Sequence, residues 1–439
     1  TYTTTGDGCR NQPESEAVIG PLGLGGLSST TSPEIGGYLN AHPRVRQVTW
    51  SNTATNRMLF EAGFGAYQAP FGPYESPGNT TRGLARVTEQ CSAGCSLNGG
   101  IPNLTYRSAN WADSWDAQYT WRGSVSYVTG SHNIKVGYGG VALVSDLQNF
   151  TNDLNLAYTV SNGMPISLTQ NLLPYTVSYR TRNMSLYVQD QWTLGRMTLQ
   201  GALRFDRNWS FSPEQQIGPT RFLPTPLVFP ETPGVSAYKD LSPRGGLAYD
   251  VFGNGKTALK VNFGKYLEPT SNNNNYILSN PIGRIATTAS RGWTDANGNF
   301  EPDCVLTSPA ANGECGAMNA QTFGTAVQTT AAIDPRILDG WSVRSNDWQI
   351  GASVQQEILP RVSIEVGYFR RWLNNFTVTD NLLVGPGDFT SYSITAPSDP
   401  RLPGGGGYTL DGLYNVVPDK VGQTSNNITE PKKFGGQCH

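Results

Sequence analysis

The segment WTDANGNFEPDC, residues 293–304, places oxygen-bearing side chains at nearly alternating positions around a glycine. Carboxylate and amide oxygens in such a loop are the ligands that Ca²⁺ prefers in proteins. The segment lacks the glutamate that closes an EF-hand, because residue 306 is leucine. An ordinary Asn/Asp/Gly turn has the same composition. Two interpretations therefore stay open: a turn, or a calcium loop with candidate ligands Asp295, Asn297, Asn299 and Asp303.

Cysteines are the second set of residues that could do chemistry. All six lie in stretches rich in Gly, Pro or Asn, and two pairs are close in sequence, Cys91 with Cys95 and Cys304 with Cys315. The pairs indicate either isolated loop thiols or two local disulfides formed in an oxidising compartment. Zinc is disfavoured, because no CxxC occurs and neither His42 nor His132 is near a cysteine pair.

The sequence gives little support for catalysis. It contains no GxSxG, no HExxH and no Walker loop, and its three histidines leave no convincing base for a nucleophilic Ser or Cys. The net charge of −2 provides no bulk attraction to nucleic acid. We therefore expect neither an enzyme nor a nucleic-acid-binding protein, and no cofactor other than the calcium considered above.

The elements that position these residues are indicated by composition. Only 15% of the 439 residues are charged, 10% are aromatic and 50 are glycine. Soluble domains carry roughly 25% charged residues. No apolar run approaches the ~20 residues of a transmembrane helix. This composition is typical of many β-strands joined by turn-rich loops, and it disfavours helical bundles and coiled coils.

A hydrophobic period of two runs through the chain. Residues 184–192 alternate between an apolar face with Leu186 and Val188 and a polar face with Tyr187 and Gln189. After a short Gly-containing connector, residues 197–207 alternate in the same way. Two alternating segments joined by a short turn predict a β-hairpin.

The same unit recurs along the chain and predicts about ten strands. The predicted hairpins are 44–50 with 57–67, 118–129 with 132–143, 184–192 with 197–207, 243–252 with 256–267, and 347–357 with 361–379. The connections between hairpins are long and irregular, at about 68–117, 144–173, 211–242 and 268–346. Short turns that alternate with long loops are typical of a membrane β-barrel.

The composition of the strand faces favours a barrel over a soluble sandwich. Aromatic residues stand at strand ends on the apolar face, with Trp50, Tyr127 and Trp192 beside short turns and Trp348, Tyr368 and Trp372 toward the long loops. These positions predict two interfacial girdles. The polar face carries large charges, which suit an aqueous lumen: Arg204, Lys260, Glu365 and Arg371. Asp190 falls on the lipid face, but near a turn, where the cost is small.

The segment LYVQDQWTLGRMTLQGALRFDR, residues 186–207, resembles the barrels of TonB-dependent outer-membrane receptors. Residues 241–266 and 347–372 agree in the same order along the chain. The resemblance is closest to the Oar-like group, which carries an N-terminal carboxypeptidase-regulatory-like domain. It covers most of the chain from about residue 33 onward. It implies that residues 1–439 are part of one larger barrel domain.

The expected organisation is a loop at 1–43, about ten strands at 44–379 and a loop at 380–439. The plug, the TonB-binding segment and the C-terminal strands of the family are expected to be absent. The fold class is an all-β, antiparallel transmembrane barrel, partial, with long extracellular loops. The resemblance implies a bacterial outer membrane location, lipid contact, coupling to the TonB complex through the missing N-terminal part, and import of an unknown ligand.

Two alternatives from other classes remain. One is a passive porin, whose barrel lacks a plug. The other is a structural or adhesive surface β-protein, in which the apolar faces form a core or contacts between subunits. The ligand-binding residues are unknown from the sequence.

Overall fold

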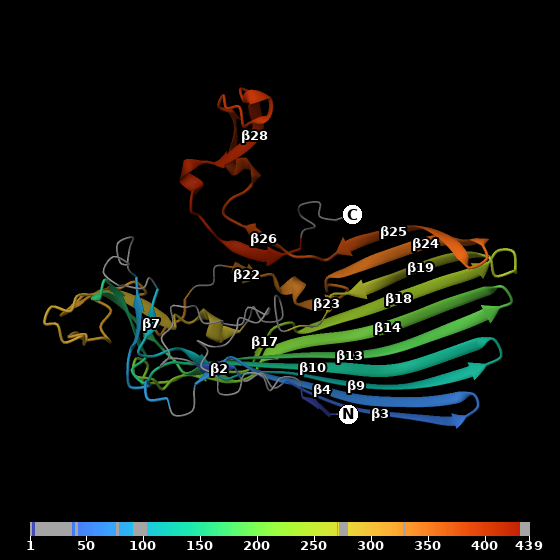
Figure 1. Cartoon of the computed structure of the whole chain (residues 1–439), viewed down its shortest axis with the longest axis horizontal. Coiled ribbons are helices and arrows are strands. Elements are labelled where there is room, and N and C mark those ends of the chain that lie inside the picture. Colours follow the sequence, from blue (N-terminus) through green and yellow to red (C-terminus); the bar gives the residue numbers. More distant parts are fainter. Residues whose placement is uncertain are drawn as a thin grey trace.

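The computed structural model describes residues 2–4, 37–39, 43–75, 79–90, 103–269, 271, 280–327 and 331–430. Long strands follow one another as antiparallel neighbours in chain order and form one curved wall (Figure 1). This confirms the predicted all-β class, and the wall contains ten long strands where about ten were predicted. The ten long strands are β3 (Arg44–Thr55), β4 (Met58–Phe71), β9 (Ser114–Thr129), β10 (His132–Phe150), β13 (Tyr175–Leu194), β14 (Met197–Ser212), β18 (Ala237–Asp250), β19 (Thr257–Leu267), β24 (Asn346–Leu359) and β25 (Val362–Asn374).

The alternation of side chains explains the pairing. In the β13–β14 hairpin, Val188 lies opposite Leu203 and Leu186 opposite Phe205, so one face of the hairpin is apolar in its middle part. The described residues leave that face uncovered: Leu186 is 54% exposed and Val188 45%. An aliphatic surface of this extent suits contact with lipid, as in an outer-membrane barrel. The turn is closed by Gly195, whose φ of 56° favours glycine.

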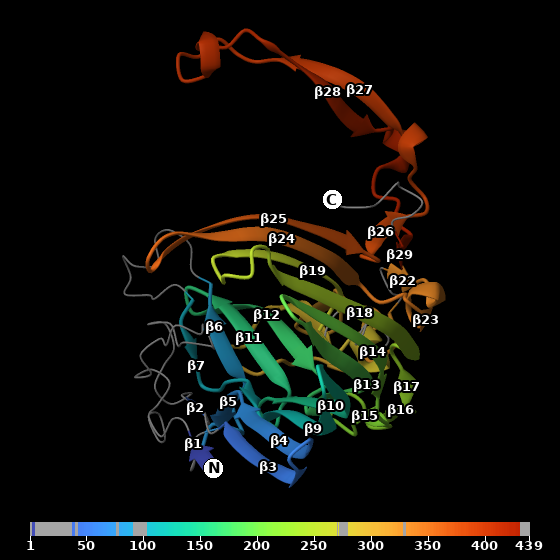
Figure 2. The ribbon, with the colours of Figure 1, turned by 90° about the vertical axis from the view of Figure 1, so that its right-hand side faces the viewer.

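The wall is an open curve (Figure 2), with β3 at one edge and β25 at the other. β3 also pairs with β1 (Tyr2–Thr4). Among the described residues, β25 has no second neighbour in the wall. A transmembrane sheet needs closed edges, because an unpaired backbone in hydrocarbon is costly. The wall is therefore part of a barrel.

Several strands are longer than the sequence predicted. β13 begins at Tyr175 rather than 184, and β10 continues to Phe150. β3 continues to Thr55, so Trp50 lies within the strand and not beside the short turn as expected. The prediction for Trp50 was wrong because the polar run SNTATN was assigned to a connector, whereas it pairs with β4. Trp192 does stand beside its turn, and Trp348 lies near the loop end of β24.

The long connections are not irregular throughout, which corrects the prediction. Parts of 68–117, 144–173 and 268–346 form one six-stranded sheet, here named the loop module, at the end of the wall that carries the long connections. Its strand order is β21 (Cys315–Met318), β20 (Thr288–Trp293), β12 (Met164–Asn171), β11 (Leu156–Ser161), β6 (Arg86–Glu89) and β7 (Thr105–Tyr106).

The region expected as a loop at 380–439 also contains strands. There β29 (Asn426–Thr429) forms a three-stranded sheet with two strands from outside or at the border of the region, β22 (Ala331–Ile333) and β26 (Val378–Asn381). A separate hairpin, β27 (Phe389–Thr395) with β28 (Thr409–Val416), projects from it (Figures 1 and 2). Within 1–43, β1 and β2 (Gly37–Leu39) are the described strands, and β2 pairs with β5 (Pro73–Glu75).

The remaining elements are short. Among the described residues the helices are 3-10 turns, and none is long and apolar enough to cross a membrane. They are η5 (Pro281–Arg284), η6 (Pro335–Ile337), η7 (Pro386–Asp388), η8 (Pro403–Gly405) and η9 (Pro418–Lys420). The further strands are β8 (Trp111–Ala112), β15 (Gln215–Ile217), β16 (Leu227–Phe229), β17 (Thr232–Pro233) and β23 (Asp339–Trp341).

Candidate functional site

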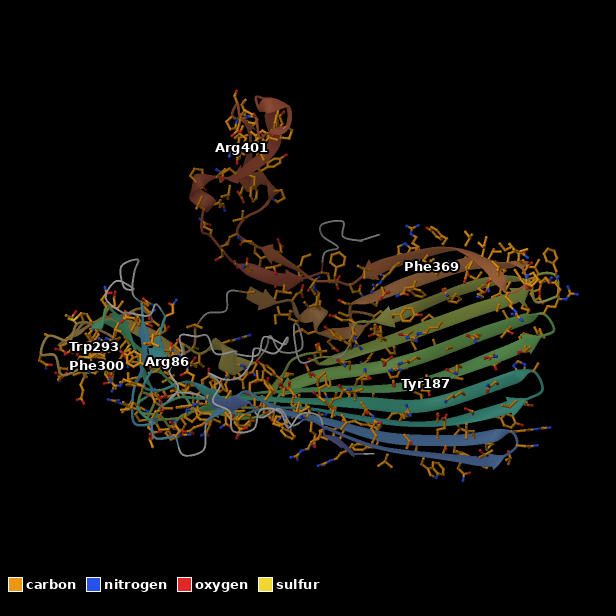
Figure 3. The ribbon with its side chains drawn as sticks, viewed as in Figure 1. Arg86, Tyr187, Trp293, Phe300, Phe369 and Arg401 are labelled. Atoms are coloured by element: carbon orange, nitrogen blue, oxygen red, sulfur yellow. A yellow bond between two sulfur atoms is a disulfide. The ribbon has the colours of Figure 1, made fainter. Side chains whose placement is uncertain are left out.

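The concave face of the wall carries the polar half of the alternating pattern. Tyr187, labelled in Figure 3, belongs to this face, whereas Leu186 and Val188 belong to the other. Several charged side chains on the concave face form ion pairs between or along strands. These pairs are Lys135 with Glu61 at 2.6 Å, Arg204 with Asp206 at 2.8 Å, Arg371 with Asp347 at 2.8 Å, and Lys260 with Glu365 at 3.7 Å. The concave face is therefore polar and charged, as a water-filled or plugged lumen requires.

Two cavities lie along the concave face. The first, of about 740 Å³, is toward the loop end, and its lining includes Asn183, Asp206 and Ser242. The second, of about 810 Å³, is toward the turn end. Carboxamides dominate its polar lining, from Asn133, Gln189, Gln191, Gln200, Asn262 and Gln349. Since an amide both donates and accepts hydrogen bonds, this cavity can bind uncharged polar groups of either kind.

The loop module joins three connections that are distant in the sequence. β6 pairs in parallel with β11, and β12 pairs antiparallel with β20. One face of the module has a core of its own, in which Val87, Val160 and Leu168 are fully buried and Trp293 is 1% exposed. Because this core is shared, the three connections form one folded unit instead of three independent loops.

Aromatic packing closes this core. The ring centroid of Trp293 lies 4.6 Å from that of Tyr158 and 5.9 Å from that of Phe300. Figure 3 shows Trp293 and Phe300 together at the far end of the molecule from the short turns. Burial raises the pKa of the Tyr158 hydroxyl. Tyr158 is therefore a packing residue and stays neutral at physiological pH.

The other face of the module is lined by small hydroxyl side chains. Thr169 and Ser290 are hydrogen-bonded across β12 and β20 at 2.9 Å, and Thr88 and Thr105 are 3.4 Å apart across β6 and β7. Thr159 and Ser167 oppose each other between these pairs. The alternation that buries Val87 and Leu168 on one face therefore presents a hydroxyl-rich face on the other. Such a face can hydrogen-bond a polar ligand in both directions.

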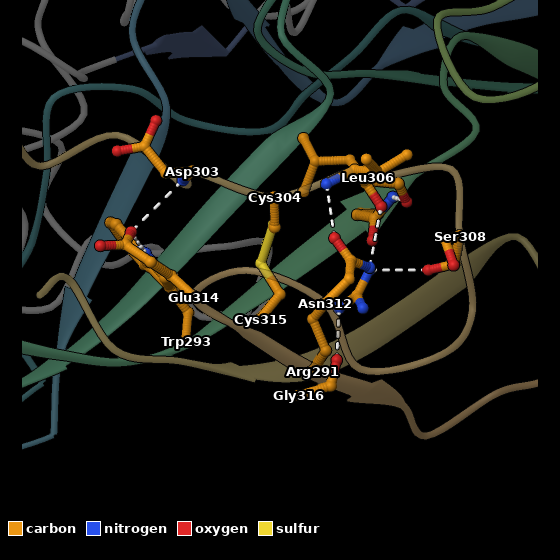
Figure 4. The surroundings of a disulfide bond; sticks show 12 residues. Arg291, Trp293, Asp303, Cys304, Leu306, Ser308, Asn312, Glu314, Cys315 and Gly316 are labelled. Atoms are coloured by element: carbon orange, nitrogen blue, oxygen red, sulfur yellow. Dashed lines mark hydrogen bonds between the residues drawn. A yellow bond between two sulfur atoms is a disulfide. The ribbon is translucent and has the colours of Figure 1, made fainter.

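The structure joins Cys304 and Cys315 in a disulfide beside β20 (Figure 4). Arg291 holds the same segment, because its guanidinium donates to the carbonyls of Ser308, Ala310 and Gly316 at 2.7–2.9 Å. Burial lowers the pKa of Arg291, but these acceptors surround its charged form. Cys91 and Cys95, the other candidate pair, lie outside the described residues.

The four candidate calcium ligands lie in one turn. The carboxylate of Asp295 accepts from the backbone N–H groups of Gly298 at 2.9 Å and Phe300 at 3.0 Å. The side-chain amides of Asn297 and Asn299 donate to Asp303 at 2.6 and 3.0 Å. Their oxygens accept from backbone N–H groups instead. Within the described residues no three acidic, His or Cys side chains gather as a metal cluster. Calcium binding stays a prediction.

The sequence did not predict a role for Glu314, which lies outside this turn and forms hydrogen bonds with it. Its carboxylate accepts from the backbone N–H groups of Ala296 at 2.8 Å and Asp303 at 3.3 Å, and from the indole of Trp293 at 3.4 Å. The only sequence signal was its place next to Cys315. Glu314 therefore holds the turn in place by hydrogen bonds to its backbone and to the indole of Trp293.

These features define the class of protein, a wall of an outer-membrane β-barrel with folded loops at one end. The outer membrane beta barrel domain family matches residues 16–377, which is most of the chain. The chain belongs to this family, and the protein is located in the bacterial outer membrane. The short turns are therefore on the periplasmic side and the loop module on the extracellular side.

Two solved structures that the chain partly matches are an outer-membrane transporter and an uptake receptor. The outer membrane transporter YddB from Escherichia coli is 13% identical with a TM-score of 0.43, and 82% of this chain covers 36% of it. The ferric yersiniabactin uptake receptor FyuA from Yersinia pestis is 8% identical with a TM-score of 0.40, and 78% of this chain covers 37% of it. The chain thus spans little more than a third of either protein. No curated protein matches the chain.

Proposed function

We propose that this chain is the barrel wall of a TonB-dependent receptor of the Oar-like group, which imports a ligand through the barrel. The observation that carries the proposal is the loop module. A core shared by three connections holds a hydroxyl-rich face in fixed geometry on the extracellular side. A preorganised polar surface lowers the entropy cost of binding a ligand. The polar inner wall below it suits passage of the same ligand.

A comparison of spent culture media tests the proposal without knowledge of the ligand. Three strains of the source bacterium are grown in complex medium: wild type, a deletion of this gene and a strain without a working TonB complex. The proposal predicts that at least one compound is depleted by the wild type and persists with both mutants. A passive porin would require the gene but not TonB. If no compound depends on the gene, the import function is wrong.

A loop variant connects the result to the structure. Thr169→Val removes a hydroxyl from the proposed binding face while keeping the shape of the side chain. Thr198→Val on β14, at the turn end, is the matched control. We expect Thr169→Val to slow uptake of the identified compound and the control to leave it unchanged. Equal effects of the two variants would contradict the role of the loop module.

A further inference from the structure

Arg244 is a cation on the inner wall without a carboxylate partner among the described residues. It lies in the middle of β18, directly opposite Gly264 of β19. Its neighbour Arg204 is held by Asp206, whereas no ion pair between described residues involves Arg244. The side chain of Arg244 lines both cavities of the concave face, so it stands where the loop-end cavity meets the turn-end cavity.

The ring of Tyr266 fixes the guanidinium of Arg244. The central carbon of the guanidinium lies 4.4 Å from the ring centroid, which is a cation–π contact. The absence of a side chain at Gly264 makes room for this stack. A Cβ atom there would be 3.1 Å from Cγ of Arg244 and 3.2 Å from Cε2 of Tyr266. The contact covers one face of the guanidinium and leaves the edges that carry its N–H donors available.

Ser242 provides a second, independent observation. It is 2% exposed, and within the described residues its hydroxyl has no hydrogen-bond partner. A buried hydroxyl without a hydrogen-bond partner costs free energy, because it loses its bonds to water and gains none in the protein. Ser242 lies two positions from Arg244 on the same face of β18 and lines the loop-end cavity. An unsatisfied donor and an unpaired guanidinium therefore face one space.

We propose that Arg244, Ser242 and Tyr266 form an oxyanion subsite on the inner wall, which takes a carboxylate or a phosphate group. The planar guanidinium can donate two parallel N–H bonds to such a group, and the hydroxyl of Ser242 can donate a third. Tyr266 orients the guanidinium and does not contact the anion. The inference goes beyond the proposed function, because such a subsite can exist whether or not the barrel imports a ligand.

The carboxylate or phosphate that binds this subsite can come from either of two molecules. It can be a group on a molecule that enters the barrel, or a carboxylate of another segment of the same polypeptide that lies in the lumen. Arg244 sits midway along β18, between the extracellular and periplasmic ends of the wall. Either source can reach it from the lumen.

Arginine footprinting of the full receptor in detergent micelles tests the subsite. Phenylglyoxal, which modifies accessible guanidinium groups, is applied with and without inorganic phosphate, and each site is followed by peptide mass spectrometry. We expect phosphate to slow modification of Arg244 several-fold. Arg57, exposed in the turn between β3 and β4, is the internal control and should not respond. If Arg244 is modified at the same rate with and without phosphate, the proposal is overturned.

Matched variants separate binding from simple shielding. Ser242→Ala should reduce the protection of Arg244 by phosphate, whereas Ser363→Ala, a change of an exposed hydroxyl on β25, should preserve it. Gly264→Ala should also reduce protection, since it displaces the stack of Arg244 on Tyr266. Full protection in both Ser242→Ala and Gly264→Ala would overturn the assignment of the subsite.

A third outcome is that phenylglyoxal does not modify Arg244 at all, with or without phosphate. In that case a second measurement decides whether an anion already covers the guanidinium. Cryo-electron microscopy of the same receptor, purified without phosphate, shows which group lies on Arg244. A carboxylate of the same polypeptide supports the proposal and identifies its source. A neutral group in that place overturns it. Neither measurement depends on uptake, so failure of the subsite and failure of the import function are distinguishable.

Discussion

Nδ1 of His132 lies 2.6 Å from Oδ2 of Asp190 on the outward face of the wall, between strands β10 and β13. The ring of His132 also stacks on Trp192, with the centroids 5.1 Å apart. Both polar groups are near the periplasmic turns, where Trp192 marks the membrane boundary. One carboxylate oxygen of Asp190, which the sequence places toward lipid, is therefore paired with a neighbouring side chain, whereas Oδ1 has no hydrogen-bond partner among the described residues.

The first prediction concerns this pair. His132→Leu leaves the carboxylate of Asp190 without its partner, and we expect a loss of about 1 kcal/mol or less, because the site is near the interface. The double variant His132→Leu with Asp190→Leu should recover the loss. The measurement is urea unfolding of the protein in lipid vesicles. A double variant less stable than the single one would contradict the interpretation.

A second prediction concerns the buried ion pair between Lys265 and Asp240. Nζ lies 3.2 Å from Oδ1, and the two side chains are 6% and 1% exposed. Lys265→Met leaves the buried carboxylate of Asp240 without its ion-pair partner and should cost about 3–5 kcal/mol. Adding Asp240→Asn should restore much of the stability in the same unfolding assay. Lys260→Met, at a 46% exposed side chain, is the control and should cost about 1 kcal/mol or less.

A further prediction is that the disulfide between Cys304 and Cys315 stabilises only its own loop segment. Its cysteines are 11 residues apart, and closing a loop of this length contributes about 2–3 kcal/mol. Cys304→Ser with Cys315→Ser should therefore make the segment 294–316 sensitive to protease, while the barrel stays resistant. Mass spectrometry of the early fragments is the measurement. Equal protease resistance of this segment in the variant and wild type would show that the disulfide does not hold it.

The environment of Asp334 predicts that the local stability around β29 depends on pH. Hydrogen bonds from Arg336 and from the hydroxyl of Thr429 hold the pKa of its carboxyl well below the ordinary value of 3.8. A carboxyl with a lowered pKa in the folded state stabilises above its ordinary pKa, and that contribution is lost as the pH falls through its folded value. Hydrogen exchange in β29, corrected for intrinsic rates, should accelerate below about pH 4.

Asp334→Asn is the control for this effect. The amide does not titrate, so the acceleration of exchange in β29 at low pH should disappear. Exchange at neutral pH should be faster than in the wild type, because the charge-assisted bonds to Arg336 are weakened. An unchanged pH profile in the variant would assign the effect to other groups.

The calcium prediction can be tested by luminescence. Tb³⁺ replaces Ca²⁺ in oxygen-rich sites, and Trp293 is close enough in sequence to sensitise it. If Asp295 and Asp303 bind a cation, Tb³⁺ emission excited through tryptophan should appear, and excess Ca²⁺ should remove it. Asp303→Asn should weaken binding. Absence of sensitised emission in the wild type would leave the segment as a plain turn.

The wall could be predicted from the sequence because its signals are local. Alternation at 184–192 and 197–207, with a glycine between, is enough for a hairpin, and sequential hairpins build the sheet. The predicted hairpin 44–50 with 57–67 was correct in place but short, since polar residues also pair in β3. Where outward positions are polar, as at Asn52, the hydrophobic alternation that marks a strand is missing, so the strand end could not be predicted.

The loop module could not be predicted in this way. β6 pairs with β11, about 70 residues away in the chain. Glu314 reaches the turn at Asp303 through the fold and not through a motif. The same holds for Arg244: the sequence shows an arginine in a strand, but only the tertiary structure shows that no described carboxylate forms an ion pair with it.

The most direct test of the central claim is the behaviour of the intact protein in outer membranes of the source bacterium. A closed barrel that contains this wall should resist carbonate washing, require detergent for extraction, and migrate faster on a gel before heating than after. Peptides from residues 44–374 should all come from that one band. A protein that is washed off without detergent and shows no heat-dependent shift would contradict a membrane-spanning wall and favour a structural or adhesive surface protein.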